Sequence, residues 1–308
     1  VSSSDPRTNF DYLWNEIDRK YSYFELKDID WDQVKEKYAQ HLYDDMSEDS
    51  LFAVLASMMN ELRDDHSNLF SPFNLSRYNL PLRKPDQYNF RTIEEHYLPH
   101  GRVTGPFFHD FLAEGQLGYI RYSSFASAFD AQQLDHLLTR YQNTKGLIMD
   151  VRENGGGDPF NVVKILERFT NEKTLVGYFI TRNGKGHNDF GERENFFLGT
   201  SDSIRYTQPL IILTDWGSYS ATTMFAVAAK ALPNVTLLGD TTGGGGGLPN
   251  GGQLPNGWTY RFSISQLLDL DGVNYAEEGV PPDIVARFDW SDLTRDEVLE
   301  KAIEVLLP

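Results

Sequence analysis

Residues 146–157, with the sequence GLIMDVRENGGG, decide the expected fold. Gly146 to Val151 is a short run that is apolar apart from Asp150, which is typical of a buried strand. The three glycines that follow allow a sharp turn that exposes backbone N–H groups. Residues 160–169 then show the apolar spacing of a helix. A buried strand, a turn and a helix in this order predict a βαβ unit.

The same alternation continues on both sides of this stretch, which predicts an α/β fold with a largely parallel sheet. A capping box at Thr294–Glu297 is expected to open the last helix. The further expected strands are residues 117–122, 210–214, 235–239 and 258–263, and the further expected helices are residues 131–141 and 220–231.

The N-terminal part is predicted to be helical. Asp5, Asp30 and Ser47 each precede a helical pattern and are expected N-caps. The helix after Ser47 has a buried stripe of Phe52, Leu55, Met59 and Leu62. These patterns predict a helical cap over residues 1–70, a proline-rich connection with a strand or two over residues 71–115, and a core over residues 116–308.

Composition excludes several classes of function. The 308 residues carry a formal net charge of −17, which argues against a nucleic-acid partner. There are no cysteines, so disulfides and thiol nucleophiles are excluded. No apolar run reaches membrane-spanning length. The chain starts at Val1 without methionine, from which we expect a removed export signal and an extracytoplasmic location, either periplasmic or membrane-anchored.

Two loops follow a buried strand and precede a helix, which is where α/β folds place their sites. The glycine turn of residues 155–157 offers N–H groups for an anion or an oxyanion. The loop DWGSYSA, residues 215–221, puts Ser220 near a helix N-terminus, where the N–H of Ala221 lacks an intrahelical partner. Taken alone, Ser220 is better explained as an N-cap, because capping serines far outnumber nucleophiles.

A third loop, GDTTGGGGG at residues 239–247, is rich in glycine. It is not a Walker A loop, because no Gly-Lys-Ser/Thr follows the glycines. By itself it is explained as a flexible surface loop.

The order of these motifs carries a resemblance. "DVRENGGG", "LTDWGSYSATTMFAVAAKAL", "LLGDTTGG" and "EEGVPPDI" resemble, in this order, the S41 peptidase family of tail-specific proteases and the tricorn core. The segments "FDYLWNEIDRKYSYFELKDIDWDQV" and "LRDDHSNLF" resemble the tricorn-type branch. The resemblance covers most of the chain and is weakest between residues 71 and 115.

The resemblance implies a crotonase-like (ClpP-like) core and serine-type hydrolysis of peptide bonds through an acyl-enzyme. The family nucleophile falls on Ser220, and its oxyanion donors fall on the N–H groups of Ala221 and of the turn at Gly156 or Gly157. The substrate is expected to be a peptide or protein, held in part by the third loop at Gly243, Gly244 and Gly245. A complete PDZ domain does not fit between cap and core.

The general base is expected to be histidine. The tail-specific branch uses a lysine whose position falls on Gly245, and no lysine lies between Lys230 and Lys301. His66, in "RDDHSN", matches the histidine of the tricorn-type branch. An imidazole titrates near neutrality, which suits a group that takes the proton of a serine.

Three residues are candidates for orienting His66. The tricorn-type branch uses a serine just before its histidine together with a distant glutamate, and Asp65 replaces that serine here. The glutamate falls on Glu277 or Glu278, while Asp65 is the alternative that would orient His66 directly. The sequence leaves this choice open.

No cofactor or metal is expected, because the other histidines lack metal-ligand spacing and HExxH is absent. The alternative function is a non-catalytic protein that binds a peptide or hydrophobic ligand on the same fold, as interphotoreceptor retinoid-binding protein does. In that case Ser220 would be only a cap. An activated hydroxyl at Ser220 discriminates between the two.

Overall fold

The computed structural model describes residues 2–78, 86–201 and 203–308 and contains two compact units. Unit 1 comprises Val1–Arg83, Phe179–Glu194 and Gly247–Leu267, and unit 2 comprises Lys84–Tyr178, Asn195–Gly246 and Leu268–Pro308. Each unit combines segments that are distant in sequence. The predicted linear domains are a different division of the chain, and they stay a prediction.

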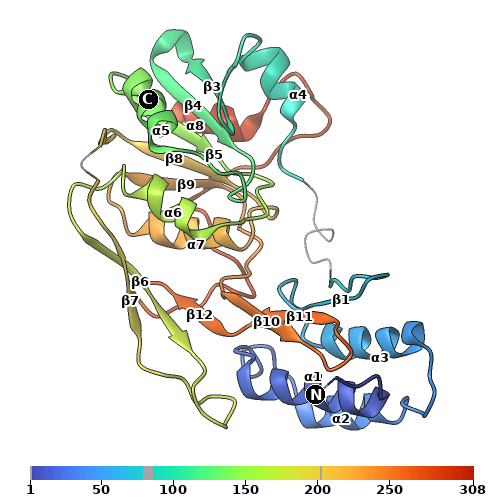
Figure 1. The fold of residues 1–308 in the computed structure, drawn as a ribbon. Coiled ribbons are helices and arrows are strands. Elements are labelled where there is room, and N and C mark those ends of the chain that lie inside the picture. Colours follow the sequence, from blue (N-terminus) through green and yellow to red (C-terminus); the bar gives the residue numbers. More distant parts are fainter. Residues whose placement is uncertain (1, 79–85, 202) are drawn as a thin grey trace. The chain divides into compact units, whose positions relative to one another are not determined.

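Unit 2 contains a seven-stranded sheet in the order β13-β9-β8-β5-β4-β3-β2 (Figure 1). The pairs from β13 to β4 are parallel, and β3 and β2 add antiparallel neighbours at one side. The predicted α/β fold with a mixed, largely parallel sheet is confirmed. The strands are β2 (Arg102–Thr104), β3 (Phe107–Leu112), β4 (Leu117–Tyr122), β5 (Gly146–Asp150), β8 (Leu210–Thr214), β9 (Val235–Gly239) and β13 (Ile284–Val285).

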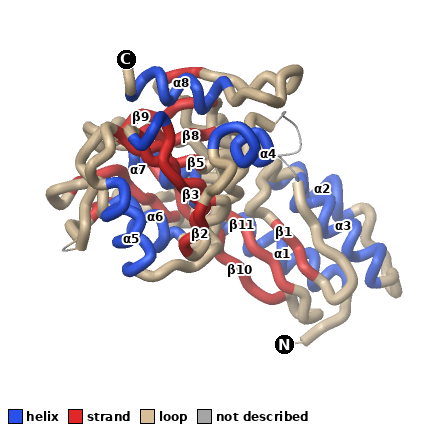
Figure 2. The backbone as a smooth tube through the Cα atoms, turned by 90° about the horizontal axis from the view of Figure 1, so that it is seen from above, coloured by secondary structure: helices blue, strands red, loops and turns tan. Residues whose placement is uncertain are grey.

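Helices cover both faces of this sheet. Figure 2 shows α8 on one side and α5 and α6 on the other. Strands β4, β5 and β8 are buried along their whole length, as expected of continuous apolar runs between two helical layers. The helices of unit 2 are α4 (Phe90–Thr92), the π-helix η2 (Ile93–Tyr97), the 3₁₀ turn η3 (Ala113–Gly115), α5 (Ala131–Tyr141), α6 (Pro159–Leu166), α7 (Ala221–Lys230) and α8 (Glu297–Leu306).

Unit 1 contains three helices and an antiparallel sheet in the order β1-β11-β10. The predicted N-caps Asp5, Asp30 and Ser47 are confirmed, because each side chain accepts a hydrogen bond from a backbone N–H three residues on. The elements are α1 (Pro6–Lys20), α2 (Trp31–Ala39), α3 (Glu48–Asn60), β1 (Asn68–Phe70), β10 (Pro249–Gln253) and β11 (Thr259–Ser263).

A third sheet has the order β12-β6-β7, with β6 at Thr174–Thr181, β7 at Glu194–Leu198 and β12 at Ser265–Leu268. Each of these strands contains a boundary between the two units. None of them was expected from the sequence. The strand or two expected in the connection are present as β2 and β3, and residues 86–115 also hold α4, η2 and η3, while residues 79–85 lie outside the described part of the chain.

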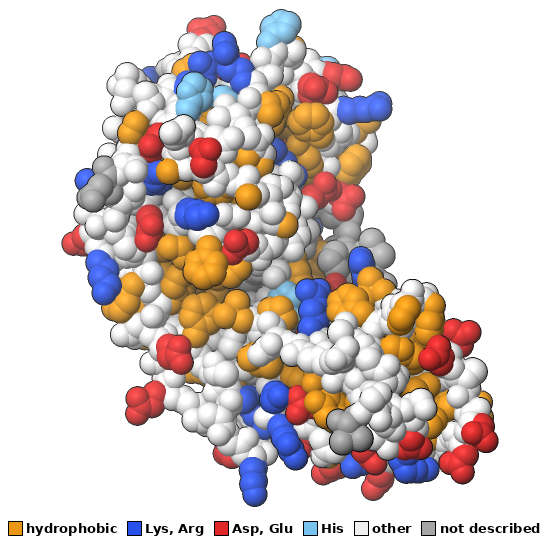
Figure 3. Space-filling model, viewed as in Figure 1, with side chains coloured by type: hydrophobic (Ala, Val, Ile, Leu, Met, Phe, Trp, Pro, Cys, Tyr) orange, Lys and Arg blue, Asp and Glu red, His pale blue; other side chains and the backbone are white. Residues whose placement is uncertain are grey.

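The face of the molecule in Figure 3 shows acidic and basic side chains interspersed with apolar patches. This mixture is what a folded surface with dispersed charge looks like. In the described ranges, none of the helices combines the length and the apolar character needed to cross a membrane.

The predicted capping box at Thr294 is wrong. Helix α8 begins at Glu297, and its N-cap is Asp296, whose side chain accepts from the Leu299 N–H at 2.9 Å. Thr294 instead donates from its N–H and its hydroxyl to Asp292 Oδ1, at 3.0 and 2.6 Å. The helix starts later because Asp296 is held by the buried guanidinium of Arg152, which lies 2.9 Å from its Oδ2.

A buried ion cluster joins the start of α8 to the end of β5. The Arg152 guanidinium lies 2.6 Å from Asp150 Oδ2 and 2.9 Å from Asp296 Oδ2, and all three side chains are inaccessible to solvent. Arg152 also donates to the Gln87 carbonyl at 2.8 Å. Arg152 stands three residues before Gly155, the first glycine of the turn, so the cluster fixes the point at which the chain leaves the sheet toward this turn.

We predict that Asp296→Ala lowers the free energy of unfolding by ~3–5 kcal/mol, because it removes one partner of a buried ion pair as well as an N-cap. Urea unfolding measures this change. The control is Glu304→Ala, which removes an exposed pair with Lys301 on the same helix and should change stability very little. Equal effects of the two substitutions would contradict the structural role of the cluster.

Candidate active site

Ser220 of unit 2 lies in a strained turn between β8 and α7. Its backbone has φ 59° and ψ −117°, a left-handed conformation that a residue with a Cβ rarely adopts. Ser220 occupies the N-cap position, yet its side chain makes no capping hydrogen bond to the helix. The explanation of Ser220 as a simple cap therefore fails. Strain of this kind costs on the order of 1–3 kcal/mol and is concentrated at functional sites.

Hydrogen bonds on both sides hold this turn. The Tyr219 N–H donates to the Asn154 carbonyl, and the Ser220 N–H donates to the Gly244 carbonyl, both at 3.0 Å. The Thr223 hydroxyl also donates to the Gly244 carbonyl, at 2.7 Å. The glycine turn and the third loop therefore fix the backbone of Ser220 from two directions.

The glycine turn lies directly against Ser220. Gly156 has φ +94°, and a Cβ built on it would lie 2.8 Å from both the Ser220 Cβ and the Ala221 nitrogen. Ala221 is the first residue of α7, so its N–H has no acceptor within the helix. The Gly156 N–H donates to Asn154 Oδ1 at 3.0 Å. Gly157 has φ +145° and packs against the backbone of residues 125–126.

Asn154 is a buried hub that the sequence analysis missed. Its Oδ1 accepts from the Thr222 hydroxyl at 3.0 Å as well as from Gly156, and its Nδ2 donates to the Tyr122 carbonyl at 2.9 Å. It thereby connects the end of β4, the glycine turn and α7. An asparagine before glycines is typical of a side chain that bonds to the backbone two residues on, and this signal could have identified it.

Asp215 provides a second connection between the two loops. Its buried Oδ1 accepts from the N–H groups of Glu153 and Ser218, at 2.8 and 3.0 Å. Burial raises the pKa of Asp215 above its usual value. Burial, together with the charges of Asp86 and Asp215, raises the pKa of Glu153 to about 7. This carboxyl group therefore titrates near neutrality, beside the glycine turn.

The third loop is buried and bonded to the protein. The Gly243 N–H donates to the Ser218 carbonyl at 2.8 Å, and the Gly245 N–H donates to the Ala276 carbonyl at 2.9 Å. Together with the bond from Ser220 to Gly244, these contacts position the loop that carries Ser220. Substrate binding by Gly243, Gly244 and Gly245 stays a prediction.

Gly245 leaves no room for a side chain. Its φ is +70°, and a Cβ built there would lie 2.4 Å from Cζ of the Tyr219 ring. A lysine at this position would displace that ring. The Tyr219 ring occupies the space that a side chain at residue 245 would need.

Glu277 and Glu278 are exposed and lie in unit 2, on the loop after Ala276 that the third loop contacts. The Gly279 N–H closes this loop by donating to the Tyr275 carbonyl at 3.0 Å. Both glutamates are thus carried by a loop that packs on the one that binds the Ser220 N–H.

His66 belongs to unit 1 and lies between α3 and β1. It is 5% exposed, its backbone N–H donates to Asp64 Oδ1 at 2.8 Å, and its ring Nδ1 lies 3.5 Å from Ser263 Oγ. Burial lowers the pKa of His66 below 6.5, the nearby Arg261 acts in the same direction, and Asp64 opposes them. His66 is therefore neutral at physiological pH.

Asp65, the predicted neighbour, is half-buried next to His66 in the chain. The sequence analysis missed Asp64 and Ser263. No local pattern could have revealed Ser263, because it is 197 residues from His66 in sequence.

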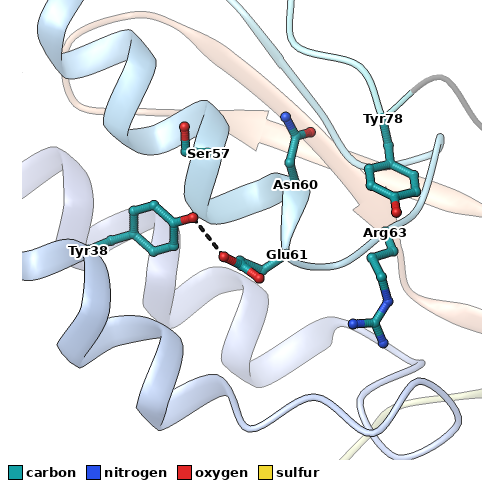
Figure 4. Close-up of a pocket in the computed structure, with 6 residues that line it drawn as sticks. All are labelled: Tyr38, Ser57, Asn60, Glu61, Arg63 and Tyr78. Atoms are coloured by element: carbon teal, nitrogen blue, oxygen red, sulfur yellow. Dashed lines mark hydrogen bonds between the residues drawn. The ribbon is translucent and has the colours of Figure 1, made fainter.

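Unit 1 contains a pocket of about 410 Å³ (Figure 4). One of its lining residues, Arg63, stands three positions before His66 in the sequence. Its lining is polar, and Tyr38 donates to Glu61 Oε1 at 2.7 Å across it. The lining residues are Tyr38, Ser57, Asn60, Glu61, Arg63 and Tyr78. Within the part of the chain that the structure describes, no group of three or more His, Asp or Glu side chains is arranged to hold a metal ion.

Comparison with family models identifies the chain's relationship. Residues 116–286 match the model of peptidase family S41, and residues 3–60 match that of the tricorn protease C1 domain. The chain belongs to peptidase family S41. The S41 match contains the glycine turn, Ser220, the third loop and both glutamates, whereas His66 lies outside both matched ranges.

Similar proteins are also described as peptidases. A Parabacteroides merdae protein, described as a candidate peptidase, has a crystal structure with 38% identity and a TM-score of 0.92, covering 99% of this chain and 98% of that one. The carboxy-terminal processing protease CtpA of Bacillus subtilis is 24% identical over 57% of this chain and 36% of its own length. The chloroplastic C-terminal processing peptidase of Tetradesmus obliquus is 28% identical over 56% and 35%. The chain thus spans about a third of these curated relatives.

We predict that Gly156→Ala slows covalent labelling of Ser220 by a fluorophosphonate probe by about 10²-fold or more, because a Cβ there would collide with Ser220 and Ala221. Labelling rates followed by mass spectrometry measure this effect. Gly155→Ala is the matched control, since a Cβ at Gly155 meets nothing within 4 Å. Equal labelling rates in the two folded variants would contradict the placement of the turn.

Proposed function

We propose that this chain is a serine peptidase in which Ser220 is the nucleophile and His66 is its general base. The observation that carries the proposal is the backbone of Ser220: a strained serine after a buried strand, at the start of a helix, without a capping hydrogen bond. A sharp strand–turn–helix connection of this type exposes a nucleophilic hydroxyl in other hydrolases as well.

The choice of base rests on two observations. Gly245 has no space for the lysine of the tail-specific branch, and a backbone conformation that favours glycine. His66 is buried with a lowered pKa, so its imidazole is in the neutral form that accepts a proton. Together they favour histidine over lysine.

In the proposed reaction, His66 takes the proton of the Ser220 hydroxyl as Oγ attacks the carbonyl carbon of the peptide bond. The N–H of Ala221 and one N–H of the turn, from Gly156 or Gly157, stabilise the oxyanion. Each such donor contributes on the order of 10²–10³ in rate. His66 then protonates the leaving amine, and water hydrolyses the acyl-enzyme in the reverse sequence of proton transfers.

For Gly156 to act as a donor, its N–H must turn from Asn154 Oδ1 to the oxyanion. Asn154 Oδ1 would keep the Thr222 hydroxyl as its donor after such a change, at 3.0 Å. The exchange therefore leaves no buried acceptor without a partner.

Asp65, Glu277 and Glu278 remain the proposed orienting residues that the family resemblance supplies. Unit 1 adds Ser263, whose Oγ lies 3.5 Å from the ring Nδ1 of His66, and Asp64, which accepts from the His66 backbone N–H.

The proposed substrate is a peptide or protein. The names of the relatives support processing near a carboxyl terminus. Residues 86–115 form part of unit 2, so in this chain they do not supply a separate peptide-binding domain. We therefore propose a short peptide as the bound segment.

We also propose the extracytoplasmic location expected from the sequence. Cell fractionation with an antibody against this chain tests it, and recovery in the cytosolic fraction alone would contradict it.

The test of the proposed function is labelling with a fluorophosphonate probe, followed by peptide mapping of the adduct. We expect one adduct, on Ser220, which is absent in Ser220→Ala. In His66→Ala the labelling rate should fall by about 10²- to 10⁴-fold, because the base is lost. His41→Ala, an exposed histidine in the same unit, is the control and should label at the wild-type rate.

The absence of an adduct on the folded wild-type protein would contradict the peptidase. It would favour the alternative, a binding protein on the same fold, and screening of peptides and hydrophobic ligands would then replace substrate profiling.

A further inference from the structure

Ser263 connects a carboxylate to the ring of His66. Its Oγ donates to Asp64 Oδ2 at 3.1 Å and lies 3.5 Å from His66 Nδ1. The three side chains are 1%, 5% and 5% exposed for Ser263, Asp64 and His66. All three belong to unit 1. Of the three, only His66 was a candidate site residue from the sequence. The arrangement is therefore a chain of buried polar groups that ends at the candidate base.

The chemistry of these groups fixes the direction of the hydrogen bonds. A carboxylate only accepts, so the Ser263 hydroxyl proton points to Asp64. The Oγ lone pairs then face Nδ1, and the contact of 3.5 Å is a hydrogen bond only if Nδ1 carries the proton. A neutral imidazole has one N–H, so Nε2 is then the unprotonated, basic nitrogen.

We propose that Ser263 and Asp64 are positioning residues that hold His66 as its Nδ1–H tautomer, with Nε2 as the basic nitrogen. This proposal rests on the proposed function of His66 as the base. It adds two orienting residues from the same unit: Asp64, between α3 and β1, and Ser263, in β11.

Both positioning residues stand on fixed backbone. Ser263 is the last residue of β11, where it pairs with Pro249 of β10, and its carbonyl accepts from the Ser22 N–H at 3.1 Å. Asp64 is held by the bond from the His66 N–H to its Oδ1, and the Ser67 N–H donates to its carbonyl at 2.9 Å. A site whose supporting groups lie on rigid elements keeps its geometry during the reaction.

The arrangement also supports the charged form of the base. When His66 takes a proton it becomes a cation, and its Nδ1–H then makes a stronger bond to Ser263 Oγ. The Asp64 carboxylate, one hydroxyl away, stabilises that positive charge. The separation of 3.5 Å between Nδ1 and Oγ is the outer limit of a hydrogen bond, so this bond is weak when His66 is neutral. It becomes stronger when His66 is protonated, so it stabilises the charged form more than the neutral form.

Arg261 lies on the same strand as Ser263 and opposes this stabilisation with its positive charge. Its Nε donates to Asn68 Oδ1 at 2.6 Å, which fixes the guanidinium on β1. The negative charge of Asp64 therefore also offsets the positive charge of Arg261, which disfavours protonation of His66.

The test measures the tautomer of His66 and the reactivity of Ser220 separately. Long-range ¹H–¹⁵N correlation spectra of the full chain, with ¹⁵N-labelled histidine and assignment by His66→Gln, report which ring nitrogen carries the proton in the neutral form. We expect Nδ1–H in the wild type. Observation of Nε2–H there would overturn the proposal, and this measurement needs neither a positioning variant nor activity.

In Ser263→Ala we expect the Nδ1–H signal to give way to a mixture of tautomers and fluorophosphonate labelling of Ser220 to slow by about 10²-fold. Asp64→Asn keeps the shape of the side chain but places an amide N–H donor where Oδ2 accepts from Ser263. The Ser263 proton is then released toward Nδ1, so we expect a shift toward the Nε2–H tautomer together with slower labelling. The control is Ser265→Ala, a buried serine whose hydroxyl accepts from the Leu248 N–H at 3.0 Å. It should leave both the tautomer and the rate unchanged.

An unchanged tautomer and rate in folded Ser263→Ala would contradict the positioning role. If Ser220 of the wild type does not label at all, the proposed peptidase fails, while the tautomer spectra still decide the hydrogen-bond arrangement. The two failures are therefore distinguishable.

Discussion

The hydrogen bonds that hold Ser220 in a left-handed backbone conformation are the constraint on which the rest of the site depends. This conformation is unfavourable for a residue with a Cβ, and it persists because Asn154 and Gly244 accept the N–H groups of Tyr219 and Ser220. Asn154 is in turn fixed by Tyr122 and Thr222, and the preceding Arg152 is fixed by the buried pair with Asp150 and Asp296. The core of unit 2 thus stabilises the strained backbone of the loop that contains Ser220.

Much of the fold followed from local patterns. The helix Ala131–Tyr141 and the strands at 117–122, 210–214 and 235–239 lie where the sequence predicted them, because their apolar periodicity is strong and their caps are clear. The start of α8 was predicted at Thr294 and lies at Glu297, because a tertiary ion pair with Arg152 selects Asp296 as the cap. Strands β6, β7, β10 and β12 escaped prediction, since they are partly exposed and lack one continuous apolar run.

The residues of the candidate site also fall into a group that the sequence indicated and a group that it did not. Ser220 and the glycine turn were predictable because loops between a buried strand and a helix are recognisable in sequence, and the family resemblance indicated His66. Ser263 was not predictable, because its contact with His66 joins segments 197 residues apart and a serine at the end of a strand is common. The crowding of Gly245 by Tyr219 likewise appears only in three dimensions.

The central claim is that a histidine, and not a lysine, activates Ser220. The pH dependence of the second-order rate of Ser220 labelling in the wild-type protein tests it most directly. Burial lowers the pKa of His66 below 6.5, so the neutral base prevails above that pH. The account predicts a rate that is constant between about pH 7.5 and 9 and falls at acid pH with the binding of a single proton. A rate that still rises between about pH 7 and 9, as a lysine base would give, would contradict the account.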